Sequence, residues 1–127
     1  MDFEYRVESK KSFPDAVAAV EAKTAEKGFR VLHVHDVQAT LAEKGFQREP
    51  LKIIEVCNAK FAYRVLSKDM KVSLFLPCKI NVFTQEGKTH LSALRPAAMP
   101  QFFPNSGIEA TAQEVDGVIT SIVDEAK

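Results

Sequence analysis

The sequence has no excess of charge of either sign. It carries 17 Lys and Arg residues against 17 Asp and Glu residues, so its formal net charge at pH 7 is zero. Proteins that hold a nucleic-acid backbone usually present a basic stripe or patch, because phosphate contacts supply much of the affinity. The balanced charge provides no such long-range field, and we expect no nucleic-acid partner.

Long hydrophobic runs are also missing. No stretch of the chain approaches the roughly 18 apolar residues that span a bilayer, so we expect no membrane partner. The first residues, MDFEYRVESKK, alternate between charged and apolar side chains and contain no apolar signal-peptide core. These two observations predict a cytoplasmic protein.

Cysteine is scarce, since the chain has only two. They form no CxxC pair, and no second Cys/His pair lies at zinc-finger spacing. In the cytoplasm two such thiols are expected to be reduced rather than bridged. The motifs GxSxG, GxGxxG, HExxH and the P-loop are absent as well, so the sequence decides neither whether the chain is an enzyme nor which cofactor it uses.

The composition is that of one globular domain. The chain has 127 residues, of which 46% are hydrophobic and 27% charged, and it contains no repeat or low-complexity linker. This length is close to the commonest size of a single domain, so one hydrophobic core is expected. We therefore treat residues 1–127 as a single domain.

The first half of the chain alternates between strand and helix patterns. Charged and apolar residues alternate from Phe3 to Val7, as in a half-buried strand. In the strand expected at 29–36, simple alternation places Phe29, Val31, His33 and His35 on one face. The remaining patterns predict helices at 13–27 and 37–44 and a buried strand at 51–57.

The second half begins with a helix expected over 59–70. Every even position from Val72 to Val82 is apolar, which predicts one long strand, or two collinear strands interrupted at Pro77. The remaining patterns predict a turn at Glu86-Gly87, a hairpin strand at 89–94, a proline-stiffened loop at 95–107 and a helix over 108–126.

The resulting element order is β-α-β-α-β-α-β-β-α. Strands separated by helices suggest βαβ crossovers in the first half, whereas the last two strands form a hairpin. We therefore predict an α+β fold, with a single mixed sheet of about five strands and four helices packed on it.

The two cysteines occupy positions where chemistry is possible. Cys57 ends a strand directly before a helix, where free backbone N–H groups favour a thiolate, and Asn58 is a good N-cap for that helix. Cys78 lies on the apolar face of its strand, after Pro77, and bulges at such prolines often occur beside sites. Either cysteine can equally be a small core residue, and the two share a pocket only if their strands are neighbours.

Two further motifs attract attention. Arg95, which precedes Pro96, is able to bind a carboxylate or phosphate bidentately, or to pair with a carboxylate of the protein itself. His33 and His35 lie two residues apart on a strand and so project from the same face, which is the beginning of a metal site. A third ligand is not evident nearby, and surface packing is the alternative interpretation.

Taken in order, several segments resemble one family. The segments are KGFRVLHVHDV (27–37), EVCNAKFAYRVL (55–66), VSLFLPCKINVF (72–83) and LSALRP (91–96). They are similar to the domain of unknown function 302 family, whose motifs are the Cys-Asn pair, the Leu-Pro-Cys kink and the Arg-Pro pair. The likeness covers residues 3–126, and one departure is Ala59, where related sequences often carry proline.

The resemblance implies a small α+β domain that is often a homodimer and has no established activity. Carried onto this chain, the family motifs point to a candidate ligand-binding region and assign no roles within it. The residues concerned are Cys57, Asn58, Pro77, Cys78 and Arg95.

Four functional hypotheses follow. The leading one is a small-ligand-binding module with a pocket near the two cysteines. In the second, Cys57 accepts a persulfide or oxidised sulfur and Cys78 resolves it, which requires a lowered pKa at Cys57. The third is metal or haem binding through a cysteine with His33 or His35. The fourth is a structural or partner-binding domain with no small ligand.

Overall fold

The structure, a computed structural model, describes residues 2–127. Within these residues one five-stranded sheet is combined with four α-helices and two 3₁₀ helices, which confirms the α+β class. The strands are β1 (Glu4–Ser9), β2 (Arg30–Asp36), β3 (Leu51–Cys57), β4 (Cys78–Gln85) and β5 (Lys88–Leu94). The helices are α1 (Phe13–Glu26), α2 (Val37–Ala42), α3 (Ala59–Lys68), η1 (Met70–Phe75), η2 (Pro96–Phe102) and α4 (Glu109–Ala126).

The strand order across the sheet is β1-β5-β4-β3-β2, and every neighbouring pair is antiparallel. The expectation of a mixed sheet with βαβ crossovers between neighbours is therefore wrong. The helix α2 has only six residues and returns the chain alongside β2, so it acts as a wide hairpin connection. Among the helices of residues 2–127, only α1 crosses the sheet, because it joins β1 and β2 at opposite edges.

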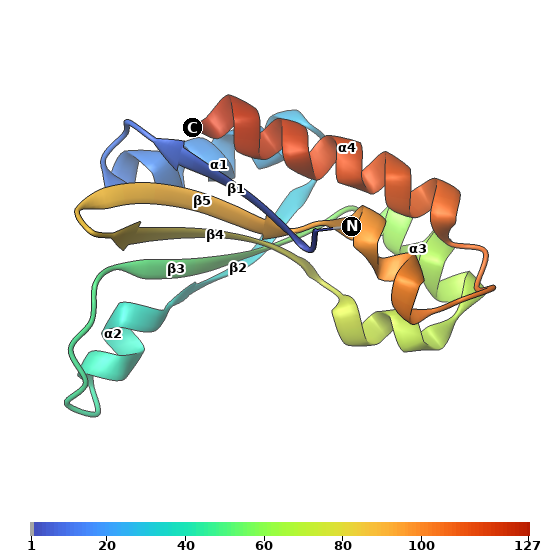
Figure 1. The fold of residues 1–127 in the computed structure, drawn as a ribbon, viewed down its shortest axis with the longest axis horizontal. Helices are drawn as coiled ribbons and strands as arrows, with labels where there is room; N and C mark the ends of the chain where they lie inside the picture. The colour runs from blue at the N-terminus through green and yellow to red at the C-terminus, as the bar shows by residue number, and fades with distance from the viewer. Residues whose placement is uncertain (1) are drawn as a thin grey trace.

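The main core lies between the sheet and two helices. Figure 1 shows α1 and α4 lying on the same face of the sheet. Val20 of α1, Ile80 of β4 and Ile122 of α4 are each fully buried in this layer. A second, smaller cluster lies under η1 and η2, and it consists of Val65, Val72, Met99, Phe103 and Ile108. The first cluster fixes α1 and α4 against one face of the sheet, and the second holds α3, η1 and η2 together.

The segment before Pro77 is not the strand that the alternation predicts. Residues Met70–Phe75 form η1, whose first turn is capped by the Asp69 carboxylate accepting from Lys71 N at 2.9 Å. Val72 is fully buried in the second cluster, whereas Leu74 is 80% exposed. The even-numbered apolar residues before Pro77 therefore do not share one buried face, and the strand begins only at Cys78.

A β-bulge in β2 changes which residues share a face. The pairing with β3 shifts between Val31 and His33, so Leu32 is an extra residue in this strand. As a result Val31 and Val34 pack against the main core. The expectation that Val31 shares the face of the histidines is therefore wrong.

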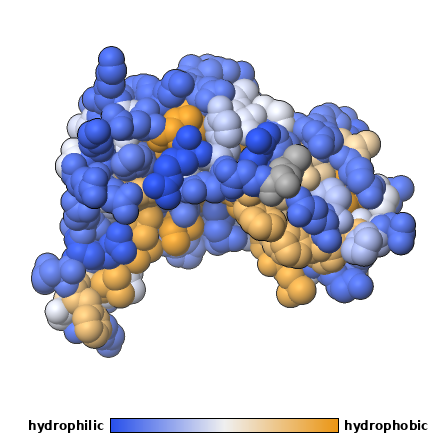
Figure 2. All heavy atoms as spheres, viewed as in Figure 1, coloured by the Kyte–Doolittle hydropathy of each residue, from blue (hydrophilic) through white to orange (hydrophobic). Residues whose placement is uncertain are grey.

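The face of the sheet opposite α1 and α4, called here the uncovered face, forms the roof of a hollow. In Figure 1, α2 projects from this side at one end of the sheet, and η1 lies at the other. Figure 2 shows the hollow between these two ends, with hydrophobic residues on both of its sides. Within residues 2–127, every helix is too short or too polar to cross a membrane.

Candidate functional site

The two cysteines meet at one cavity. Their strands are neighbours in the sheet, and Val56 lies directly opposite Cys78 in the register of β3 and β4. The cavity measures about 30 Å³, which is room for roughly two water-sized groups. Its lining comprises Phe29, Val56, Cys57, Asn58, Phe61, Ala62, Val65, Leu76, Cys78, Met99, Ala112 and Val115. We call it the cysteine cavity.

The polar groups of Asn58 are used by the fold itself. The Asn58 Oδ1 atom accepts from Phe61 N at 3.1 Å and so caps α3. The Nδ2 atom donates to the Gly28 carbonyl at 3.0 Å, which ties the start of α3 to the end of α1. Asn58 therefore fixes the junction between strand and helix, and the two thiols are the distinctive groups of the cavity wall.

Both thiols are held in the neutral form. Burial raises the pKa of Cys57 above its usual value. Burial also raises the pKa of Cys78 to about 11, with a further contribution from the negative charge that Cys57 would carry. Neither cysteine is bridged. The start of α3 therefore does not produce the lowered pKa that thiol transfer through Cys57 requires.

Pro77 lies outside the cysteine cavity and lines a second small cavity. This cavity also measures about 30 Å³, and it lies between β4 and η2. Its lining comprises Phe75, Pro77, Cys78, Lys79, Leu94, Pro96 and Met99. Cys78 and Met99 line both cavities, so these two sulfur-containing side chains separate one cavity from the other.

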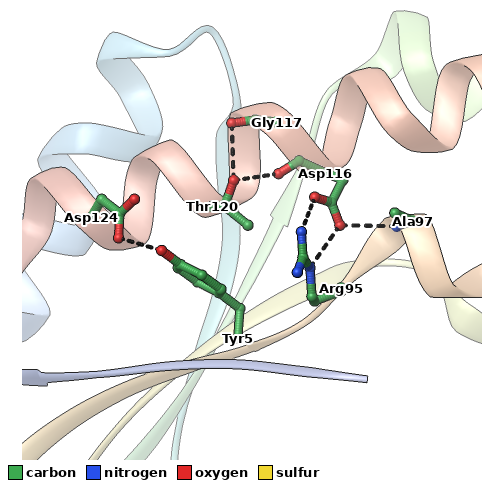
Figure 3. Close-up of polar contacts among 7 residues, drawn as sticks. All are labelled: Tyr5, Arg95, Ala97, Asp116, Gly117, Thr120 and Asp124. Atoms are coloured by element: carbon green, nitrogen blue, oxygen red, sulfur yellow. Dashed lines mark hydrogen bonds and ion pairs between the residues drawn. The ribbon is translucent and has the colours of Figure 1, made fainter. Parts of the chain in front are cut away.

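Arg95 lines neither cavity and binds a carboxylate of the protein. Figure 3 shows its guanidinium group facing Asp116 of α4. The Nη2 atom donates to Oδ1 at 2.9 Å, and Nε donates to Oδ2 at 3.3 Å. Asp116 is only 5% exposed and also accepts from Ala97 N at 3.1 Å. This buried carboxylate thus fastens the start of η2 to α4.

Tyr5 extends the same cluster toward the end of α4. Its hydroxyl donates to Asp124 Oδ1 at 2.7 Å, and the Arg95 guanidinium lies 5.6 Å from the centre of its ring (Figure 3). Sequence reasoning found Arg95 and missed Asp116. One signal was available, since Asp116 follows Ala112 by four residues and therefore lies on the apolar stripe of the helix.

The histidines of β2 lie close together. The ring centres of His33 and His35 are 4.4 Å apart, and His35 Nε2 lies 3.2 Å from Glu55 Oε2. Among residues 2–127, no group of three or more His, Cys, Asp or Glu side chains is placed to hold a metal ion. Neither histidine lines the cysteine cavity, so the structure does not bring the two candidate sites together.

Fold and site together define a small α+β domain with an apolar, thiol-lined cavity between an antiparallel sheet and its helices. The chain belongs to the family described as Domain of unknown function DUF302, whose model matches residues 5–126. This confirms the resemblance found in the sequence motifs.

One solved structure extends this likeness to the whole fold. The chain is similar to the crystal structure of an uncharacterized conserved DUF302 protein from Bacillus stearothermophilus. The two share 27% sequence identity and superpose with a TM-score of 0.94, over 100% of each chain. No curated protein matches the chain.

Proposed function

We propose that the chain is a cytosolic binding module for a small ligand whose uncharged end enters the cysteine cavity. The observation that carries the proposal is the pairing of two neutral thiols with an otherwise apolar wall. Such a wall offers dispersion and soft sulfur contacts, and few hydrogen bonds. The unbridged cysteines are compatible with a reducing compartment.

The size of the cavity limits the ligand. A volume of about 30 Å³ accepts a methyl or methylthio group rather than an aromatic ring. The rest of the ligand would extend through the partly exposed side at Cys57 and Asn58. The cavity therefore favours a thioether or a short aliphatic group as the end that is recognised.

A titration with two probes of similar shape tests the proposal. Dimethyl sulfide is soft and apolar, whereas dimethyl sulfoxide is strongly polar at the same position. In methyl-detected NMR we expect dimethyl sulfide to shift the signals of Val65 and Met99, and dimethyl sulfoxide to leave them in place. Equal shifts with both probes, or none with either, would remove the soft apolar site.

A pair of variants in α3 provides the control. Ala62 lines the cavity, whereas Ala59 lies in the same helix, is exposed and does not line it. Ala62→Leu fills the cavity and should abolish the response to dimethyl sulfide, while Ala59→Leu should retain it. A native mass spectrum of untagged protein then asks whether a bound small molecule is lost in Ala62→Leu and kept in Ala59→Leu.

We also propose that the chain forms a homodimer through an apolar surface beside the hollow. This surface, called the aromatic patch, consists of Phe3, Phe75, Leu94 and Phe102. The ring of Phe102 lies 5.5 Å from that of Phe3 and 5.3 Å from that of Phe75. Three of its four members are at least 44% exposed, and clustered exposure of this kind is typical of protein interfaces.

A further inference from the structure

The uncovered face of the sheet carries a groove that is larger than the cysteine cavity and is lined by neither cysteine. It lies between α2 and the strands β3 and β4 and measures about 320 Å³, a volume typical of small-molecule sites. We call it the α2 groove. Its lining comprises His35, Val37, Thr40, Leu41, Ile53, Glu55 and Lys79. The α2 end of the hollow in Figure 2 marks its position.

The α2 groove has an apolar part and a charged part. Val37 and Leu41 of α2 and Ile53 of β3 form the apolar part. Glu55 and Lys79 form the charged part, and they lie directly opposite each other in the register of β3 and β4. Side chains at such positions are immediate neighbours on one face of a sheet. The groove thus offers one negative and one positive group beside a hydrophobic wall.

Glu55 and Lys79 carry opposite charges and face each other across the two strands, yet each side chain contacts a different group. The Glu55 Oε2 atom lies 3.2 Å from His35 Nε2. Lys79 Nζ donates to the Pro77 carbonyl at 3.1 Å, which leaves an ammonium group with further hydrogens to donate. The carboxylate retains a second oxygen in the same way. Both groups therefore keep hydrogen-bonding capacity for a ligand placed between them.

We propose that the α2 groove binds a free α-amino acid with an aliphatic side chain. The ligand ammonium would lie against Glu55, its carboxylate against Lys79, and its side chain against Val37, Leu41 and Ile53. A zwitterion satisfies both charges of the groove at once. A simple carboxylate would leave Glu55 facing a like charge, and a simple amine would do the same at Lys79.

Titrations with L-leucine and two truncated analogues test the ligand class. 4-Methylpentanoate lacks the ammonium group, and 3-methylbutylamine lacks the carboxylate. We expect leucine to shift the methyl signals of Leu41 and Ile53, with each analogue binding at least tenfold more weakly. If leucine shifts neither signal at concentrations on the order of 10 mM, or if an analogue binds as tightly as leucine, the proposal is overturned.

Charge-neutral variants test the assigned contacts. Lys79→Gln and Glu55→Gln should each weaken leucine binding at least tenfold, and Glu55→Gln should shift the preference toward 4-methylpentanoate. The controls are Lys88→Gln and Glu8→Gln, because these residues form a cross-strand pair at 3.7 Å outside the groove. Equal weakening in the controls contradicts the proposal. The Val65 signal reports the cysteine cavity separately, because Val65 does not line the groove, so the two sites fail or succeed independently.

Discussion

At the scale of single residues, the important property of the two cysteines is that their thiols stay protonated. In the folded chain, burial holds the pKa of Cys78 at about 11, against an ordinary value of 9.0. A thiol that stays protonated behaves as a small hydrophobic group with a weak S–H donor. The chemistry of the cavity is therefore that of recognition, and the same pKa shift makes the stability of the fold depend on pH.

We predict that the free energy of unfolding falls as the pH rises from 9 to 11. Since the folded pKa of Cys78 is raised, its contribution is fully present below the unfolded pKa and is lost as the pH passes about 11. The free energy of unfolding, measured by urea denaturation, should decrease between pH 8 and pH 11 in the wild type. In Cys78→Ala this decrease should be smaller by about 2 kcal/mol.

A control is needed because Tyr5 titrates in the same region. Its hydrogen bond to Asp124 raises the pKa of the Tyr5 hydroxyl above 10.0. The comparison is therefore repeated in a Tyr5→Phe background. If Cys78→Ala shows the same pH dependence as its parent in both backgrounds, Cys78 is not the titrating group.

Asp116 provides a second prediction at this scale. Replacing it with Ala leaves the Ala97 N–H and the partly buried Arg95 guanidinium without their acceptor. We expect Asp116→Ala to lower the free energy of unfolding by about 2–4 kcal/mol, measured by urea denaturation. Glu114→Ala breaks the exposed pair with Arg64 and should cost less than about 1 kcal/mol. Similar losses in both variants would contradict this account of Asp116.

At the scale of elements, the junction between β3 and α3 depends on one amide side chain. Asn58 caps α3 and holds the Gly28 carbonyl. Asn58→Ala should lower the free energy of unfolding by about 1–2 kcal/mol, since it removes both hydrogen bonds. Asn58→Asp retains the cap and should lower the free energy of unfolding less than Asn58→Ala does. A thermal melt in which Asn58→Asp is less stable than Asn58→Ala would contradict the role of the cap, because both variants lose the donor to the Gly28 carbonyl and only Asn58→Asp keeps the cap acceptor.

The elements that local signals specify were predicted well. The helix predicted at 13–27 is α1 (Phe13–Glu26), and the hairpin of β4 and β5 turns at Glu86-Gly87, as expected. The segment before Pro77 was not predicted, because an alternating pattern does not reveal that Val72 packs under η2 while Leu74 faces solvent. The β2 bulge was missed for a related reason, since its extra residue leaves no trace in composition.

At the scale of the whole molecule, the candidate residues separate into distinct places. The sequence indicated that Cys57 and Cys78 would share a pocket if their strands were neighbours, and β3 and β4 are neighbours. It did not indicate that Arg95 lies elsewhere, because its partner Asp116 is 21 residues further along the chain. The α2 groove was missed entirely, since its lining combines four elements, β2, α2, β3 and β4, through an antiparallel register that the predicted crossovers excluded.

The proposed dimer yields a prediction for the intact chain. If the aromatic patch forms the interface, sedimentation equilibrium should give twice the chain mass of 14.1 kDa for the wild type. Leu94→Lys and Phe102→Lys should shift the mass to that of the monomer, because a buried lysine without a partner is costly. Tyr63 is 75% exposed outside the patch, so Tyr63→Lys should remain dimeric. A monomeric wild type would contradict the proposal.

The position of β1 has a consequence for synthesis of the chain on the ribosome. Among the five described strands β1 is translated first, and its single neighbour there is β5 (Lys88–Leu94), which is translated last. During translation β1 therefore has no strand to pair with while β2, β3 and β4 are synthesised. Its alternating charged residues, Glu4, Arg6 and Glu8, protect the unpaired strand during this time, because charged strands resist pairing with other chains. The sheet closes only after Leu94, the last residue of β5, has emerged.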